Sequence, residues 1–284
     1  MGEENQAKVG TISDYEPRLV KACESVLIEI GQIMGEYRDS IAIIGGLVPR
    51  YLIPEGQDPH CGSTDIDLAI NFKEISNESY QTLLGILKSH GYKQDKDQPF
   101  KFYKDLPEDI TVELDLMAGE YGGTGRGHRT QRIQDVNARK TRGCDLVFQD
   151  TVAITIEGEM PDGSSNSVEI KISNIIPFLA MKGFALNDRK KEKDAYDIYY
   201  CLKNYPGGIA AIRECLLPHK NNKLVRKGLE NIYSKFKTIN HIGPRWVTDF
   251  LNITDPEERE LVQRDAFELV MQLIKEAGIS RGRS

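Results

Sequence analysis

Residues 63–71 read STDIDLAIN, and this stretch decides the fold that we expect for the chain. Its polar and apolar residues alternate with a period of two, which predicts a β-strand that buries one face. Asp65 and Asp67 then point to the same face, with Cα atoms about 6.6–6.8 Å apart. Two like charges about 5 Å apart cost on the order of 3 kcal/mol at an effective dielectric constant of about 20. The pair therefore indicates either a Mg²⁺ site, because this ion prefers carboxylate oxygens, or a solvated edge strand.

A second alternating strand is expected at residues 111–117, which read TVELDLM. Glu113 and Asp115 share one face of this strand, and the apolar residues share the other. If the two strands are neighbours, a third carboxylate joins Asp65 and Asp67. We take Asp115 as this third ligand and Glu113 as the alternative. Three acids on neighbouring strands favour the metal site over the solvated edge.

A glycine pair precedes these strands. Residues 40–44 are predicted to form a short buried strand, and Gly45-Gly46 then leads into a short helix over residues 47–53 with Pro49 in its first turn. This arrangement is typical of anion sites, since glycine lets the backbone approach a phosphate and the free amides at the helix start face it. A glycine pair also occurs as a simple tight turn.

Length and composition indicate an ordinary globular chain. It has 284 residues, of which 28% are charged and 39% hydrophobic, and no window is apolar enough to span a membrane. The five cysteines are scattered without a Cys-x-x-Cys pair, which predicts reduced thiols in a cytoplasmic protein. The net charge of −6 conceals a basic segment, because residues 182–245 hold 14 Lys and Arg against 6 Asp and Glu. That segment can hold an RNA or polyphosphate, or it can simply carry solvated lysines.

The other predicted elements divide the chain into two parts. Helices are expected at residues 14–37 and 78–91 and strands at 100–103, 145–157 and 167–172, with a hairpin turn at 161–165. Residues 118–143 are expected to form a long loop or partly helical insertion. Its basic residues either contact phosphates or lie on a mobile surface, and they are Arg126, His128, Arg129, Arg132, Arg139, Lys140 and Arg142. From residue 174 the pattern is helical, with helices near 174–187, 189–200, 208–217, 221–236, 244–251 and 256–277. We therefore expect an α/β (α+β) catalytic domain over residues 1–172 and a helical domain over residues 173–284.

Lys182 lies on the apolar face of the helix expected at residues 174–187. It follows Ile175 by seven positions and Phe178 by four, so it either extends to solvent along that face or reaches a buried anion such as a nucleotide phosphate. In the next helix, the spacing predicts i,i+4 ion pairs between Lys190 and Asp194 and between Lys193 and Asp197.

These motifs resemble a known family when taken together. The segments 43–46 (IIGG), 63–67 (STDID) and 113–115 (ELD) resemble the core of the nucleotidyltransferase superfamily, which has the DNA polymerase β-like fold. The later segment, with Lys182, Lys193, Asp194 and Asp197, resembles the Lys…Lys-Asp-x-x-Asp signature of the AbiEii/AbiGii-type toxins of bacterial toxin–antitoxin and phage-defence modules. The resemblance covers about residues 40–202. The chain departs from the superfamily pattern at Gly45-Gly46, where a Gly-Ser pair is usual.

The resemblance implies a mixed β-sheet with flanking helices, a C-terminal helical domain and transfer of a nucleotide from an NTP to an acceptor. The acceptor expected is RNA, such as the 3′ end of a tRNA, and a cognate antitoxin protein is a possible partner, with no membrane involved. Our hypothesis places two Mg²⁺ ions on the three aspartates, with the other residues binding or orienting the nucleotide. The expected site consists of the metal ligands Asp65, Asp67 and Asp115, of Gly45, Gly46, Ser63 and Lys182 around the phosphates, and of Lys193, Asp194 and Asp197.

Two alternatives remain open at the level of the sequence. The chain can be a catalytically idle nucleotide-binding module that acts through protein contacts. It can also be a nucleotidyltransferase that acts on a small molecule such as an aminoglycoside.

Overall fold

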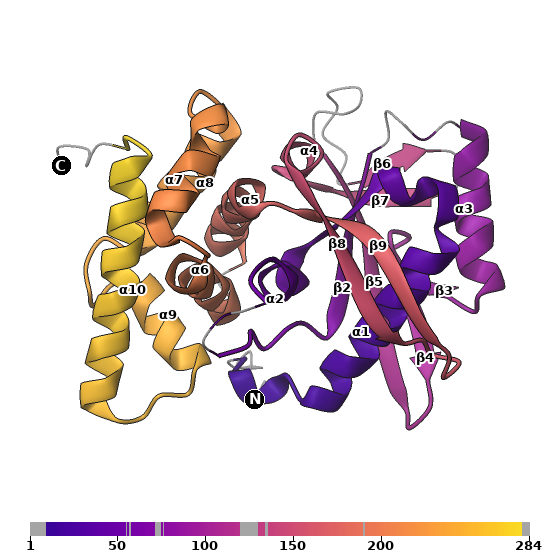
Figure 1. Ribbon diagram of the computed structural model, residues 1–284, viewed down its shortest axis with the longest axis horizontal. Helices are drawn as coiled ribbons and strands as arrows, with labels where there is room; N and C mark the ends of the chain where they lie inside the picture. Colours follow the sequence, from indigo (N-terminus) through magenta and orange to yellow (C-terminus); the bar gives the residue numbers. More distant parts are fainter. Residues whose placement is uncertain are drawn as a thin grey trace, which may run out of the picture.

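The computed structural model describes residues 10–279 except residues 55, 57, 72–74, 76, 120–129, 134, 135 and 190. Within these residues, nine strands form one mixed sheet and the chain after Ser173 is helical. The sheet lies at one end of the molecule and helices α5–α10 lie at the other, with α2 between them (Figure 1). This arrangement confirms a mixed α/β architecture. The division into two domains at residue 172 stays a prediction.

The strands are β1 (Ile41–Ile44), β2 (Asp65–Ile70), β3 (Lys93–Gln94), β4 (Lys101–Leu106), β5 (Ile110–Gly119), β6 (Thr130–Ile133), β7 (Val136–Thr141), β8 (Thr151–Glu159) and β9 (Ser165–Ser173). The helices are α1 (Pro17–Ile33), α2 (Val48–Leu52), α3 (Asn77–Ser89), α4 (Cys144–Val147), α5 (Ile175–Asp188), α6 (Glu192–Asn204), α7 (Gly208–Leu216), α8 (Lys223–Lys235), α9 (Ile242–Phe250) and α10 (Pro256–Glu276). Short 3-10 turns add Ile12–Asp14, Gly35–Ser40, Gly45–Leu47 and Leu217–His219.

The strand order is β3-β4-β5-β2-β1-β9-β8, and the hairpin β6–β7 joins through β7 to the end of β5. β2 pairs parallel with β5 and antiparallel with β1, while β1 pairs parallel with β9. The two alternating acidic strands expected from the sequence are therefore direct neighbours in the middle of the sheet.

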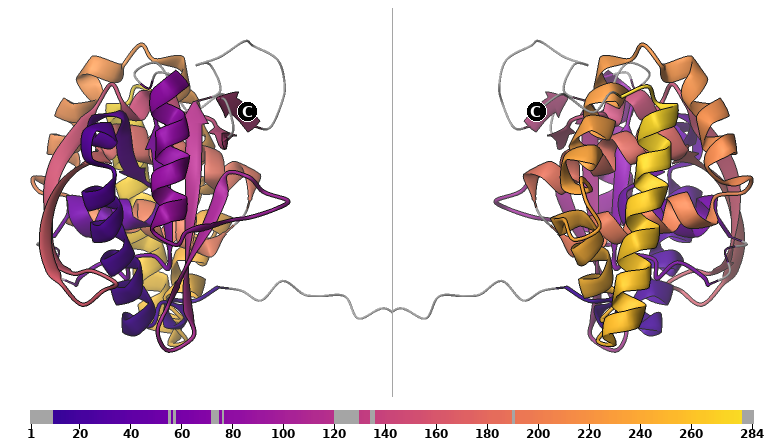
Figure 2. Two further views of the ribbon diagram at one scale, coloured as in Figure 1. Left: turned by 90° about the vertical axis from the view of Figure 1, so that its right-hand side faces the viewer. Right: turned by 90° about the vertical axis from the view of Figure 1, so that its left-hand side faces the viewer.

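One face of the sheet is the main core. Ile66, Leu68, Leu114 and Leu116 are almost completely buried there, as the alternation of β2 and β5 predicts. Helices α1 and α3 cover this face, with α1 crossing it diagonally (Figures 1 and 2). Burying a large aliphatic side chain stabilises the fold by about 1.5–3 kcal/mol, so this face sets the register of the central strands.

The opposite face holds a smaller apolar cluster. Ala42, Ile44, Ala69 and Met117 line it, and the short helix α4 packs on them. The acidic residues of β2 and β5 lie on this second face, because they alternate with the core residues. The second face is therefore where a polar site can form.

Three sequence predictions are wrong in detail. Residues 130–141 form the strands β6 and β7 in place of a loop or partly helical insertion, and backbone pairing with β5 stabilises β7 although it has little apolar alternation. Residues 144–147 form α4, so β8 begins only at Thr151; Gly143, at φ +88°, turns the chain into α4. The first long helix ends at Ile33, and a 3-10 turn that starts at Gly35 (φ +43°) follows.

In the described ranges, no helix combines the length and the apolar character that crossing a bilayer requires.

Two glycines let α5 and α8 approach each other closely. A Cβ at Gly183 would lie 2.0 Å from the carbonyl oxygen of Gly228, and a Cβ at Gly228 would lie 2.5 Å from that of Ala180. These atoms belong to the backbone, so they cannot move aside as a flexible side chain does. The crossing therefore depends on the absence of side chains at both positions.

We expect Gly183→Ala to destabilise the protein by about 1–3 kcal/mol or more, the usual cost of overpacking a close contact. Gly85→Ala is the matched control, since Gly85 lies exposed in α3 with no atom within 4 Å of its would-be Cβ. There, alanine is expected to stabilise the helix by about 0.5–1 kcal/mol. Urea unfolding of both variants measures the difference, and equal free energies of unfolding would contradict the close crossing.

Candidate functional site

Four acidic side chains share one face of the two central strands. The parallel register places Asp65 opposite Glu113 and Asp67 opposite Asp115. Residues in register on neighbouring strands point the same way, so all four carboxylates lie on the face away from α1. The strand pairing that the third-carboxylate hypothesis requires is present, with Asp115 directly beside Asp67.

The charged form of Asp67 is disfavoured in the folded protein. Burial, followed by the nearby charges of Asp65 and Asp115, raises the pKa of Asp67 to about 7. Burial also raises the pKa of Asp115, although Lys101 opposes this shift. The protein therefore holds negative charge here that its own cations compensate incompletely.

Protein side chains already engage three of these acids. Ser63 Oγ donates a hydrogen bond to Asp65, and Lys101 binds Glu113 while its Nζ lies 3.4 Å from Asp115 Oδ1. Within the described residues, no three His, Cys, Asp or Glu side chains form a group ready to hold a metal ion. Asp115 Oδ1 is nevertheless buried without a hydrogen bond. A divalent ion at these acids would replace the contacts that Ser63 and Lys101 make.

The glycine turn packs directly against the acids. Gly45 has φ +73°, a conformation that favours glycine, and a Cβ there would lie 2.0 Å from Asp67 Oδ2. A Cβ at Gly46 would lie 2.7 Å from Ser63 Oγ and 3.1 Å from Lys193 Nζ. The turn thus brings the backbone of both glycines against three polar side chains. Asp67 comes from β2, Ser63 from just before β2 and Lys193 from α6.

A cavity of about 330 Å³ opens at this turn. Gly45 and Asp67 line one wall, and α5 contributes a wall with Phe178, Met181 and Lys182. Its remaining charged lining residues are Arg139, Lys140, Arg142, Asp188 and Arg189. Cations therefore predominate around the cavity, against two acidic lining residues, Asp67 and Asp188.

Lys182 belongs to a buried ionic cluster between α5 and α6. Its Nζ lies 2.8 Å from Asp194 Oδ1 and 2.6 Å from Asp197 Oδ2. Lys193 Nζ donates to Asp197 Oδ1 at 2.9 Å, and Arg189 binds both oxygens of Asp194 at 2.8 Å. Of the two alternatives that the sequence left for Lys182, the structure shows burial against anionic partners, and these partners are aspartates of the protein.

The lysines determine the ionisation of the aspartates. Burial alone raises the pKa of Asp194, but Lys182 and Arg189 outweigh it and lower the pKa to about 2. The same balance, with Lys182 and Lys193 as the cations, holds the pKa of Asp197 well below its usual range. The i,i+4 pair of Lys193 and Asp197 agrees with the sequence prediction, whereas the pair with Lys190 lies outside the described residues.

His60 is a member of this cluster that the sequence did not indicate. Its Nε2 lies 2.9 Å from Asp197 Oδ1, a contact between positions 137 residues apart. It belongs to the segment that joins α2 to β2, and its buried ring stacks on Tyr196. A single histidine in a polar loop carries no local signal of such a contact.

The expected basic loop is only partly described. Arg126, His128 and Arg129 lie outside the described residues, and Arg132 is placed only through its backbone in β6. Arg139, Lys140 and Arg142 belong to β7 and the turn after it, where they line the cavity. The structure thus brings part of the predicted phosphate-binding segment to the acidic strands.

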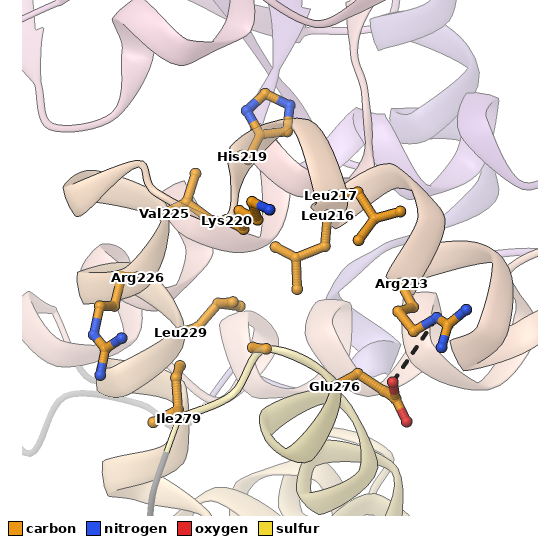
Figure 3. A pocket seen from close by; sticks show the side chains of 11 residues that line it. Arg213, Leu216, Leu217, His219, Lys220, Val225, Arg226, Leu229, Glu276 and Ile279 are labelled. Carbon is orange, nitrogen blue, oxygen red and sulfur yellow. Dashed lines mark ion pairs between the residues drawn. The ribbon is translucent and has the colours of Figure 1, made fainter.

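A second, smaller cavity of about 50 Å³ lies among α7, α8 and the end of α10 (Figure 3). Arg213 on its wall pairs with Glu214 and lies 3.9 Å from Glu276, and Arg226 pairs with Glu230. None of the site residues expected from the sequence lines it. This cavity is separate from the candidate site.

No family model matches the chain, and no curated protein matches it.

We expect Asp67→Asn to stabilise the metal-free protein at pH 8 and to do so much less at pH 5. The pKa of Asp67 is raised from 3.8 to about 7, so above pH 7 the folded state carries an unfavourable charge that asparagine removes. Between pH 7 and pH 3.8 the folded wild type holds a proton that the unfolded chain has lost, so the penalty shrinks as the pH falls and is gone only below pH 3.8. The gain at pH 8 is on the order of a few kcal/mol.

Urea unfolding at both pH values, in the presence of EDTA, measures this effect. Asp97→Asn is the control, because Asp97 is exposed at a turn. A loss of stability at pH 8, or a gain that is independent of pH, would show that folding does not disfavour the charge of Asp67.

Proposed function

We propose that this chain is a Mg²⁺-dependent nucleotidyltransferase that moves a nucleotide from an NTP to an acceptor. The observation that carries the proposal is the parallel register of β2 and β5. It gathers Asp65, Asp67 and Asp115 on one face, beside a cavity that Gly45, Asp67 and Lys182 line. This combination supports a nucleotidyltransferase-like fold for the sheet.

The acids fit Mg²⁺ in their chemistry. Carboxylate oxygens are the ligands that this ion prefers, and the buried charge of Asp67 beside Asp65 and Asp115 is one that a cation would stabilise. Mg²⁺ held by Asp65, Asp67 and Asp115 would lower the pKa of the attacking hydroxyl and neutralise the leaving pyrophosphate. Asp115 is preferred over Glu113 because it lies beside Asp67 and is more deeply buried.

The cationic side of the cavity suits a triphosphate. Lys182 and Arg189 line it and are held by Asp194, so their positions are fixed before a substrate binds. Fixed charges of this kind stabilise a transition state without reorganising. The cavity volume of about 330 Å³ lies within the range of about 300–1,000 Å³ that is usual for small-molecule sites.

The proposed acceptor is RNA. Arg139 and Arg142 are exposed and line the same cavity, so phosphates of a bound strand can reach the transfer site. The resemblance of the segment from Lys182 to Asp197 extends the proposal to a toxin of a toxin–antitoxin or phage-defence module, with a cognate antitoxin as partner.

One observation favours a second candidate, an idle nucleotide-binding module. The described residues hold no group of three ligands ready for a metal ion, and Asp65 and Asp115 are engaged by Ser63 and Lys101. In such a module the cavity binds a nucleotide while the acids keep their protein partners.

Incubation with each radiolabelled NTP, Mg²⁺ and total RNA, followed by gel autoradiography, tests the two candidates. We expect labelled RNA with the wild type, and a loss of at least about 100-fold in Asp65→Asn/Asp67→Asn and in Asp115→Asn, the scale of removing one transition-state stabiliser. Glu113→Gln is the matched control on the same face and is expected to retain labelling.

Labelling that persists in the double variant would refute the catalytic assignment. NTP binding without labelling of RNA or of an aminoglycoside would identify the idle module. Labelling of the aminoglycoside alone would move the acceptor from RNA to small molecules.

RNA binding is expected to depend steeply on salt, and Arg139→Gln to reduce that dependence. Removing one cation that binds a phosphate of a single strand makes the slope of log K against log salt shallower by about 0.7. Lys88→Gln is the control, since Lys88 is exposed on α3, on the other face of the sheet. Filter binding at several salt concentrations measures the slopes, and identical slopes for the two variants would exclude Arg139 from the RNA path.

A further inference from the structure

The orientation of the His60 ring follows from its two hydrogen bonds. The backbone N–H of Gly62 donates to Nδ1 at 3.1 Å, so Nδ1 carries no hydrogen. Burial lowers the pKa of His60 to about 4, which keeps the ring neutral at ordinary pH. The single ring proton is therefore on Nε2, and it is donated to Asp197 Oδ1 at 2.9 Å.

Aromatic contacts hold the ring in this position. Tyr196 stacks on it with centroids 5.3 Å apart, and Tyr200 meets it edge-on at 4.8 Å. Tyr200 is itself fixed, because its hydroxyl donates to the carbonyl of Asp58 at 2.9 Å. The imidazole thus reaches Asp197 in one defined orientation.

Asp197 is the carboxylate that this proton orients. Its Oδ1 accepts from both His60 and Lys193, and its Oδ2 lies 2.6 Å from Lys182 Nζ. His60 is the neutral donor of the three, so it fixes the carboxylate plane without adding charge. The plane of this carboxylate in turn determines where the two ammonium groups lie, one beside Gly46 and one at the cavity.

We propose that His60 is a positioning residue of the transfer site, which orients Asp197 and through it Lys182 and Lys193. This inference rests on the proposed function, since it assigns those lysines to a bound NTP. The structural alternative is that His60 serves only to hold the turn at Gly62.

Two substitutions separate these roles. The Oδ1 atom of asparagine is two bonds from Cβ, as Nδ1 is, so His60→Asn keeps an acceptor for Gly62 and loses the donor to Asp197. The Nε2 atom of glutamine is three bonds from Cβ, as Nε2 of histidine is, so His60→Gln keeps the donor to Asp197 and loses the acceptor. Both remove the ring and its stacking on Tyr196, which makes them matched controls for each other.

We expect His60→Gln to retain kcat/KM for NTP within about threefold and His60→Asn to lose more than about tenfold. The opposite order would assign His60 to the turn and overturn the proposal. Equal losses accompanied by equal falls in Tm would also overturn it, because they would reflect the missing ring alone.

A second measurement does not depend on transfer. Long-range ¹H–¹⁵N spectra of the unliganded wild type are expected to show His60 as the neutral Nε2–H tautomer. The ammonium ¹⁵N signals of Lys182 and Lys193 are expected to persist in His60→Gln and to shift or broaden in His60→Asn. If the wild type transfers no nucleotide, the proposed function fails while these spectra still test His60, and unchanged lysine signals in His60→Asn would overturn the positioning role.

Discussion

The buried carboxylate of Asp197 is the constraint on which the rest of the structure depends. Removing an ion from water costs several kcal/mol, and the protein recovers this only when each charged atom has a partner. Here the partners come from three places in the chain: His60 before β2, Lys182 on α5 and Lys193 on α6. The pairing is complete only when both helices dock beside the start of β2, so the cluster specifies how the helical half meets the sheet. We infer that it contributes to the uniqueness of that arrangement more than to net stability, because the desolvation of the buried charges offsets much of their attraction.

The acids on β2 and β5 differ from the aspartates of this cluster, because their negative charge is only partly compensated by nearby cations. Asp194 has cations on both oxygens and a pKa near 2, whereas Asp67 lies among like charges and has a pKa near 7. Lys182 and Arg189 lower the pKa of both carboxylates. A balanced cluster therefore holds cations rigidly beside an unbalanced group of anions. The place where these cations meet these anions suits a ligand that carries both a cation and phosphates, such as a magnesium–triphosphate complex.

The sequence predicted the parts of the site that have a local period. Alternation places Asp65 and Asp115 on strands, and the strand–glycine–helix pattern locates Gly45, because in each case neighbours in sequence are neighbours in space. Two parts had no such signal. β7 has a single almost fully buried apolar residue among those whose side chains are described, Ala138, and forms through backbone pairing with β5. The contact of His60 with Asp197 joins positions 137 residues apart, so only the folded chain reveals it.

The glycine at position 46 has a structural explanation. A Cβ at this position would lie 2.7 Å from Ser63 Oγ and 3.1 Å from Lys193 Nζ, so a serine here would displace both side chains. The hydroxyl of Ser63 already occupies that space, and it donates to Asp65. A hydroxyl is thus present beside the turn, but it comes from Ser63, just before β2, instead of from the turn itself. Glycine at position 46 therefore leaves room beside the turn for the hydroxyl of Ser63 and the ammonium group of Lys193.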